Sequence, residues 1–107
     1  MNVSMAGTIN GITNESGGIP DEFYLSQNYP NPFNPSTIIN FKLPKDGFVT
    51  LKVYDMLGRE VAVLVNEFKP IGNYSVNFDA SSFSSGVYVY TIKAGTFVDS
   101  KKMVLVK

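Results

Sequence analysis

The sequence predicts an all-β fold, an antiparallel sandwich of about seven strands, from three observations. From Tyr24 onward, apolar and polar residues alternate with a period of two. Turn signals such as PKDG, DMLGR, KPIG and SSG recur at nearly regular intervals, and no helical pattern lies between them. The chain has 107 residues, of which 44% are hydrophobic. That suffices for one core but hardly for two, because single domains usually run to about 100–150 residues.

The alternation marks five strands. Residues 36–43 and 48–54 are joined by the turn PKDG, and residues 72–78 follow. Residues 86–94 and 97–106 form the last hairpin, around a turn of sequence AGT. The positions expected to share a face within these strands are Thr37, Ile39, Phe41 and Leu43; Val49, Leu51 and Val53; Tyr74, Val76 and Phe78; and Tyr88, Tyr90 and Ile92.

The segment between the second and third of these strands has a less regular pattern. Residues 61–65, VAVLV, are apolar throughout, which suits a strand covered on both sides or a short buried helix. Their length and β-branching favour the strand. Just before them, Asp55, Gly58 and Arg59 predict a tight hairpin connection with Gly58 left-handed and Arg59 or Glu60 solvated.

Charge and composition exclude several classes of function. Nine basic and nine acidic residues give no net charge and the basic residues are scattered, so the basic patch of a nucleic-acid binder is missing. No apolar run approaches the roughly 20 residues that cross a bilayer, so we expect no membrane span. The absence of His and Cys removes the usual general base, a thiol nucleophile and the commonest metal ligands. We expect no cofactor and no metal ion, and Asp79 with its neighbouring serines does not match a calcium-binding loop.

Residues 1–20, MNVSMAGTINGITNESGGIP, are rich in Gly, Asn, Ser and Thr. Such a segment buries too little apolar surface to offset the entropy of ordering it, so we expect a flexible linker followed by a domain at residues 21–107. The N-terminus also lacks the basic-then-apolar order of a secretory signal. If the parent protein is exported, its signal lies upstream.

The segment YLSQNYPNPFNP, residues 24–35, predicts a stiff crossover that leads into the strand at residue 36. Prolines donate no hydrogen bond to a ladder and push the preceding residue toward extended geometry. The asparagine side chains can bond neighbouring backbone groups in place of a ladder. We expect the aromatic rings to pin this crossover onto one end of the sandwich. The residues concerned are Tyr29, Pro30, Asn31, Pro32 and Phe33.

Two other functions have candidate residues in the sequence. The carboxylates of Asp55, Glu60, Glu67, Asp79 and Asp99 are available for acid–base chemistry, but a sandwich of this size offers no deep cleft to raise the pKa of one of them. We therefore expect no enzyme. An accessory carbohydrate-binding module is the alternative function, with an aromatic stacking platform. Its candidate rings are Tyr24, Tyr29, Phe33 and Phe83.

Four motifs then stand in one order along residues 19–107: FYLSQNYPNPFNPSTIINFKLP, VYDMLGREV, GNYSVNFDASSFSSGVYVY and a terminal KMVLVK. Together they closely resemble the type A C-terminal sorting domain of the type IX secretion system, found on exported proteins of Bacteroidetes and their relatives. One departure is Phe78, where relatives often carry Trp. The exchange keeps an apolar aromatic residue at this position.

The resemblance implies an Ig-like β-sandwich fused behind a passenger protein and recognised, as a folded monomer, by the secretion machinery at the outer membrane. The protein is then secreted or held at the cell surface. A sortase-like surface protease is implied to cut near the N-terminal junction, which corresponds to Ile19, Pro20 and Phe23. The implied recognition surface involves Gly86, Tyr88, Lys102 and Lys107.

Each of these recognition residues also has a structural interpretation. Gly86 suits the turn into its strand, and Tyr88 suits a core that lacks Trp. Lys102 and Lys107 suit edge-strand charges that prevent sheets from aggregating. The sequence alone leaves both interpretations open.

Overall fold

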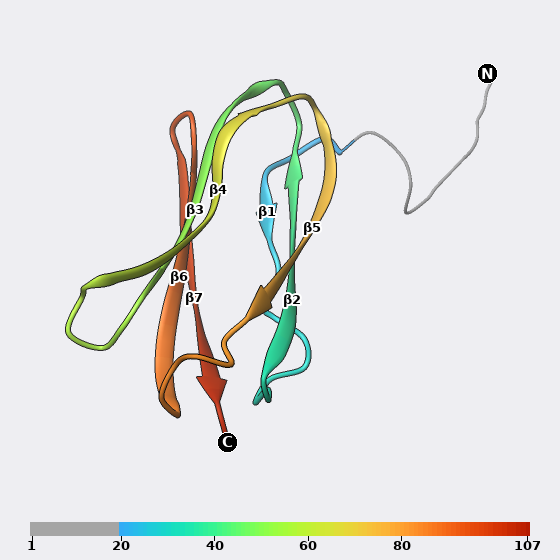
Figure 1. The fold of residues 1–107 in the computed structure, drawn as a ribbon. Helices are drawn as coiled ribbons and strands as arrows, with labels where there is room; N and C mark the ends of the chain where they lie inside the picture. Colours follow the sequence, from blue (N-terminus) through green and yellow to red (C-terminus); the bar gives the residue numbers. More distant parts are fainter. Residues whose placement is uncertain (1–19) are drawn as a thin grey trace.

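The computed structural model describes residues 20–107, which form seven strands and no helix (Figure 1). Accordingly, no described helix is long and apolar enough to cross a membrane. The expected linker at residues 1–20 lies, apart from Pro20, outside the described residues. The strands are β1 (Tyr24–Leu25), β2 (Ser36–Leu43), β3 (Gly47–Tyr54), β4 (Glu60–Lys69), β5 (Gly72–Asp79), β6 (Gly86–Ala94) and β7 (Phe97–Leu105).

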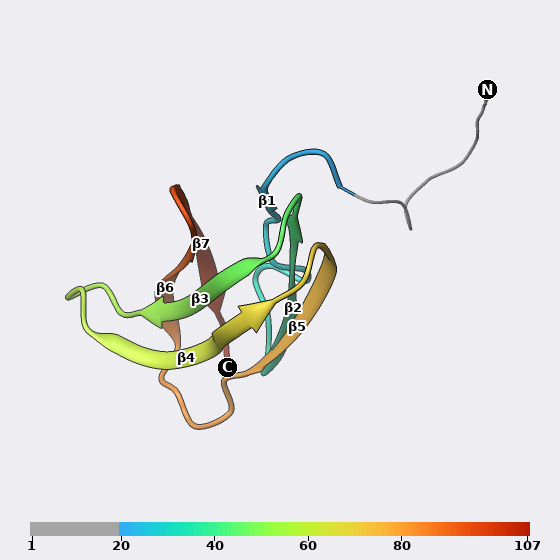
Figure 2. The same ribbon diagram turned by 90° about the horizontal axis from the view of Figure 1, so that it is seen from above.

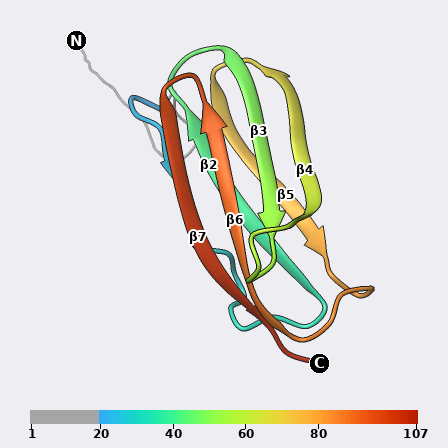
Figure 3. The same cartoon turned by 90° about the vertical axis from the view of Figure 1, so that its left-hand side faces the viewer.

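The strands form two antiparallel sheets that face each other, as Figure 2 shows from above. One sheet has the order β1-β2-β5, and the other has the order β4-β3-β6-β7. Figure 3 looks onto the four-stranded sheet, with β2 and β5 behind it. This arrangement confirms the predicted all-β sandwich and is consistent with an Ig-like fold.

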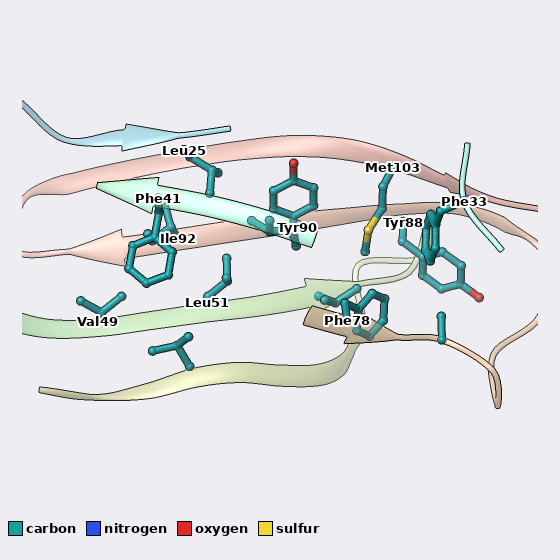
Figure 4. Packing of buried hydrophobic residues seen from close by; sticks show 14 of the residues in the cluster. Leu25, Phe33, Phe41, Val49, Leu51, Phe78, Tyr88, Tyr90, Ile92 and Met103 are labelled. Atoms are coloured by element: carbon teal, nitrogen blue, oxygen red, sulfur yellow. The ribbon is translucent and has the colours of Figure 1, made fainter. Parts of the chain in front are cut away.

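The core lies between the sheets, and the period-two alternation of the sequence predicts which side chains enter it. In β2 and β3 the burial pattern alternates residue by residue, and every position expected to share a face there is buried. In β5, only Phe78 of the three expected positions is fully buried, since Tyr74 and Val76 are half-exposed. The largest fully buried side chains include Phe33, Phe41, Tyr90 and Met103 (Figure 4).

The prediction for VAVLV was partly wrong. The segment is a strand, β4, but Val61 is 37% and Val63 is 47% exposed. The reason is that β4 forms the edge of the four-stranded sheet, and no second layer among the described residues covers the outer face of that sheet. Two register shifts between β3 and β4, at Leu51/Lys52 and Val53/Tyr54, mark irregular pairing along the same edge.

The two ends of the sandwich carry different parts of the chain. At one end, which we call the junction end, Phe23 stacks on Phe97 with ring centroids 4.9 Å apart, next to the β6–β7 turn. The opposite or distal end carries Lys107, the β5–β6 loop (residues 80–85) and the crossover (Figure 1). The chain therefore enters the fold at one end and leaves it at the other.

Tyr90 links the two sheets through the middle of the core. Its ring is fully buried on β6, and its hydroxyl donates a hydrogen bond of 2.6 Å to the carbonyl oxygen of Ser26, next to β1. Burial raises the pKa of the Tyr90 phenol from 10.0 to about 12, because the phenolate would lose its hydration in the core.

This shift predicts alkaline destabilisation. Between pH 10.0 and about 12 the unfolded chain releases the Tyr90 proton while the folded chain keeps it, so the free energy of unfolding should fall as pH rises. The slope contributed by this one group should approach about 1.4 kcal/mol per pH unit. Urea unfolding over this pH range should therefore show a shallower pH dependence for Tyr90→Phe than for the wild type. Tyr29→Phe, at an exposed ring, is the control, and equal slopes for all three proteins would contradict the prediction.

Candidate functional site

The crossover runs along the outer edge of β7 and is bonded to it through backbone and side chain. The N–H of Phe33 donates to the carbonyl oxygen of Val104 at 2.9 Å, and the N–H of Val106 donates to the carbonyl oxygen of Phe33 at 3.0 Å. Asn31 Oδ1 accepts the N–H of Val104 at 2.9 Å. The peptide bonds before Pro30, Pro32 and Pro35 are cis. Together these contacts attach the crossover directly to the last strand.

Of the two crossover aromatics, only Phe33 packs into the fold. Its ring is 2% exposed and lies 6.1 Å from the ring of Phe78, centroid to centroid. The ring of Tyr29 is 80% exposed, contrary to the expectation that both rings pin the crossover. Tyr29 contributes through its backbone instead, because its N–H and C=O both pair with Ile38. The residue extends the edge of the three-stranded sheet and leaves its side chain in solvent.

Asn28 organises the start of the crossover, a role that the sequence reasoning did not assign. Its amide is 2% exposed, and Nδ2 donates to the carbonyl oxygen of Pro30 at 3.1 Å and to Thr37 Oγ1 at 3.0 Å. Thr37 Oγ1 donates to the same Pro30 carbonyl at 2.8 Å, and Gln27 Nε2 donates to Asn28 Oδ1 at 2.7 Å. The sequence did contain an indication of this role. Thr37 is a polar residue on an otherwise apolar strand face, so its hydroxyl needs a buried hydrogen-bonding partner.

A chain of four aromatic rings fills the distal end of the core. Phe78 lies against Phe83 at 5.6 Å, and Phe83 lies against Tyr88 at 5.8 Å, centroid to centroid. Through these four rings, the crossover, β5, the β5–β6 loop and β6 share one packing cluster, of which Figure 4 shows Phe33, Phe78 and Tyr88. Phe78 contacts both Phe33 and Phe83 and so joins the two halves of this chain of rings.

Tyr88 and Gly86 both shape the β5–β6 connection. Tyr88 is 9% exposed, and its hydroxyl donates at 2.7 Å to the carbonyl oxygen of Ser84, four residues upstream. Ig-like sandwiches use the same arrangement, the tyrosine corner, to brace this connection. Gly86 has a φ of +154°, which L side chains rarely adopt, and a Cβ placed there would meet open space. Its backbone conformation, and not crowding, is what requires glycine.

Lys107 lies across the β5–β6 loop. Its Nζ donates to the carbonyl oxygen of Ser81 at 2.6 Å, and its N–H donates to Ser85 Oγ at 3.2 Å. The N–H of Ser81 donates to Asp79 Oδ1 at 2.9 Å. This backbone bond lowers the pKa of the Asp79 carboxyl, and the Ser81 hydroxyl and the Lys107 charge lower it further. The distal surface therefore presents an ammonium and a carboxylate side by side.

The hairpin tip between β3 and β4 is a second polar cluster, and it is structural. Asp55 Oδ1 accepts the N–H groups of Leu57 and Arg59, and Oδ2 accepts Arg59 Nε at 2.8 Å. The backbone bond from Arg59 is the main cause of the lowered pKa of the Asp55 carboxyl. Gly58 has the predicted left-handed φ, at +83°. Arg59 and Glu60 are both exposed, as expected, but each also forms a surface ion pair, Arg59 with Asp55 and Glu60 with Lys52 at 3.1 Å.

Within residues 20–107, the residues considered for metal binding and for carbohydrate stacking do not come together in one site. Among residues 20–107, no cluster of three or more acidic side chains is placed to hold a metal ion. The proposed aromatic platform does not form, because Phe33 is buried and Phe83 packs against Phe78 and Tyr88. Tyr24 lies on β1, and Lys42 Nζ lies 5.3 Å from its ring centroid. The exposed ring of Tyr29 belongs to the crossover, where the residue pairs with Ile38.

Comparison with protein families matches residues 27–107 to the model of the secretion system C-terminal sorting domain. This range covers most of the chain. The chain belongs to the type IX secretion system C-terminal sorting domain family. Comparison with curated proteins and with solved structures returned no match. The family marks proteins that are exported to the cell surface or secreted, and the sorting domain itself is not catalytic.

The sorting domain brings some of the expected recognition residues together and separates one. Gly86 and Lys107 lie at the distal end, with Tyr88 beneath them in the core. Lys102 lies further along β7, exposed on the outer face of the four-stranded sheet in register with Val89. Lys102 and Lys107 are exposed and Gly86 is half-buried, whereas Tyr88 is largely buried and supports the loop from inside.

The expected processing region is at the junction end of the sorting domain. Phe23 is half-buried against Phe97, whereas Asp21 and Glu22 are exposed. Pro20 is the first described residue, and Ile19 lies outside the described residues. The packed part of the fold thus begins at Phe23, at the end opposite to Lys107.

The different burial of the two crossover rings predicts different mutational costs. Phe33→Ala should lower the free energy of unfolding by about 3–5 kcal/mol, because it empties a buried site in the ring cluster. Tyr29→Ala removes an exposed ring and should change it by no more than about 0.5 kcal/mol. Urea denaturation of both variants measures the difference. Similar costs for the two substitutions would show that Phe33 does not anchor the crossover.

Proposed function

We propose that this sorting domain directs a passenger fused upstream across the outer membrane, that the secretion machinery binds its distal end, and that a surface protease cuts at its junction end. The observation that carries the proposal is the family match over residues 27–107. The fold supports the assignment of recognition and cleavage to two different ends of the domain. Because the junction and the distal end lie at opposite ends of the sandwich, a passenger at the junction leaves the distal end accessible (Figure 1).

The distal end suits recognition because its exposed groups are held by a rigid base. Lys107 is bonded to two residues of the β5–β6 loop, and that loop is braced by Tyr88 and the ring cluster. Partner surfaces built on rigid elements lose less entropy on binding. The Lys107 ammonium also retains donors for an acceptor on the machinery, since Lys carries three.

The junction end suits proteolysis. Asp21 and Glu22 are exposed and precede the first packed residue, Phe23. Proteases cut exposed and weakly held segments in preference to packed ones. We therefore place the cleavage before Phe23, within a segment that begins in the expected linker.

The alternative, a carbohydrate-binding module, is not favoured by the site. Phe48 and Phe68 are exposed cross-strand partners on β3 and β4, but they are not the rings expected to form a platform. Two phenylalanine rings also carry no polar atom to orient a sugar.

A reporter fusion tests the proposal. A signal peptide, a folded reporter and residues 19–107 should be expressed as one chain in a host with the type IX machinery. The reporter should reach the cell exterior and lose a fragment whose cut lies near Ile19 to Phe23, as measured by fractionation and mass spectrometry. The same reporter without residues 19–107 should stay in the periplasm. An intact fusion that is folded, uncut and periplasmic would show that this domain is not a sorting signal.

Charge removal at the distal end and on β7 tests the recognition residues. In the fusion, Lys102→Ala with Lys107→Ala should reduce export about tenfold, which corresponds to about 1.4 kcal/mol of lost binding free energy. Neither residue is buried, so the melting temperature should stay close to that of the wild type. Lys45→Ala with Lys93→Ala removes two exposed lysines elsewhere and is the control. Equal export of both double variants would mean that Lys102 and Lys107 are not recognised and serve only to protect the sheet edge from aggregation. If export falls, the single variants Lys102→Ala and Lys107→Ala would show which lysine is responsible.

A further inference from the structure

The outer edge of β7 is a place where another strand could add to the four-stranded sheet. β7 is the last strand of that sheet, and it pairs with β6 on one side only. In an antiparallel strand every second residue directs its N–H and C=O away from its partner, so an open edge exposes a row of unpaired groups. Outward-facing backbone groups of Lys102, Val104 and Val106, on β7 and just beyond it, form hydrogen bonds with the crossover.

The crossover occupies this row at consecutive outward positions. Gln27 Nε2 donates to the Lys102 carbonyl oxygen at 2.6 Å. Both groups of Val104 are bonded, its N–H to Asn31 Oδ1 and its C=O to the N–H of Phe33, each at 2.9 Å. The N–H of Val106 donates to the carbonyl oxygen of Phe33. Nearer the β6–β7 turn, Asp99 Oδ1 accepts the N–H of Ser100 at 2.9 Å, so part of that segment is closed by its own side chain.

The segment that covers this edge is itself a poor partner for a further strand. Pro30, Pro32 and Pro35 have no N–H, so the crossover offers a third strand few donors on its own outer side. A regular strand in the same place would only have moved the open edge outward by one strand. Two of the contacts with β7 come from side chains, Gln27 and Asn31, which a ladder does not need.

We propose that residues 27–33 form an edge cap, and that the partner this cap excludes is a second copy of the same chain pairing through β7. The uncapped edge is self-complementary. An antiparallel pair related by a two-fold axis at Val104 sets Val104 against Val104 and Lys102 against Val106, and its one kind of like-charge pair, Lys101 against Lys107, lies at the two ends of the pairing. The outward groups of Val104 would then bond their counterparts in the second copy in place of Asn31 and Phe33.

The opposite edge of the same sheet, β4, differs from β7 in the regularity of its pairing, since both strands carry charged side chains but only β4 is irregular. β4 carries Glu60, Glu67 and Lys69 along its length and has two register shifts against β3. Charged side chains and bulges are the usual means of keeping an edge strand from pairing. β7 lacks register shifts in its pairing with β6.

The test loosens the cap without emptying the core. In the full chain, Gln27→Ala with Asn31→Ala removes both side-chain bonds to β7 and leaves Phe33 in place. Hydrogen exchange at the Val104 amide should accelerate about tenfold, as expected for the loss of one hydrogen bond of about 1.4 kcal/mol. Sedimentation equilibrium should show a concentration-dependent dimer for this variant and a monomer for the wild type.

Two matched variants control for nonspecific effects. Asn34→Ala alters an exposed asparagine in the same segment that has no bond to β7, and it should behave like the wild type. Gln27→Ala with Asn31→Asp keeps an acceptor oxygen for the Val104 N–H and should restore most of the protection. If the double alanine variant does not fold, Gln27→Ala alone, which loses the bonds to Lys102 and Asn28 but keeps Asn31 on Val104, should show a smaller change in the same direction.

Cross-linking identifies the edge that pairs. The chain has no cysteine, so Val104→Cys provides a unique thiol. When Val104→Cys is combined with Gln27→Ala and Asn31→Ala, the loosened variant, the protein should form a disulfide-linked dimer under mild oxidation, because directly opposed strand residues lie within disulfide range. In the capped chain it should not, and neither should Val63→Cys on β4 in the loosened variant. Unchanged exchange at Val104, a monomer despite faster exchange, or cross-linking through Val63 would each overturn the proposal.

Discussion

The fold depends most on the attachment of the proline-rich crossover to the last strand. Residues separated by about seventy positions meet there, as in the bonds from Asn31 to Val104 and from Gln27 to Lys102. Backbone bonds align the segment, and burial of Phe33 provides the free energy that holds it, since an exposed bond alone contributes little. The first connection of the chain and its last strand therefore form as one unit.

This attachment also links the core to the distal surface, which we propose that the secretion machinery binds. Phe33 touches Phe78, and through Phe83 the ring cluster reaches Tyr88 beneath the β5–β6 loop. That loop in turn holds Lys107 through Ser81 and Ser85. A partner that binds the distal end consequently reads a surface that exists only in the folded domain. Because the junction lies at the other end, the proposed recognition and the proposed cleavage involve different residues.

The candidate site was only partly predictable. Tyr29 and Phe33 have the same character in the sequence, yet one ring is exposed and the other is buried. The difference arises because Phe33 faces the gap between the sheets at β7, whereas Tyr29 lies beside Ile38 at the edge of the other sheet. The bond from Asn28 to Pro30, two residues on, is of the local kind expected for asparagine. Its buried bond to Thr37 was missed because these two residues become neighbours only when the crossover folds back on β2.

The sequence by itself determined the strands β2, β3, β5, β6 and β7, the inward faces of β2, β3 and β6, and the family, because these follow from local alternation, turn residues and ordered motifs. It did not mark β1, which lies within the segment expected to be a crossover. Only the tertiary structure decided which strands became edges and which exposed groups gathered at one end. VAVLV illustrates the limit, since a uniformly apolar run reads as covered on both sides, but its place at the edge of a sheet leaves Val63 in solvent. Edge position depends on the pairing of all the other strands, and no local pattern encodes it.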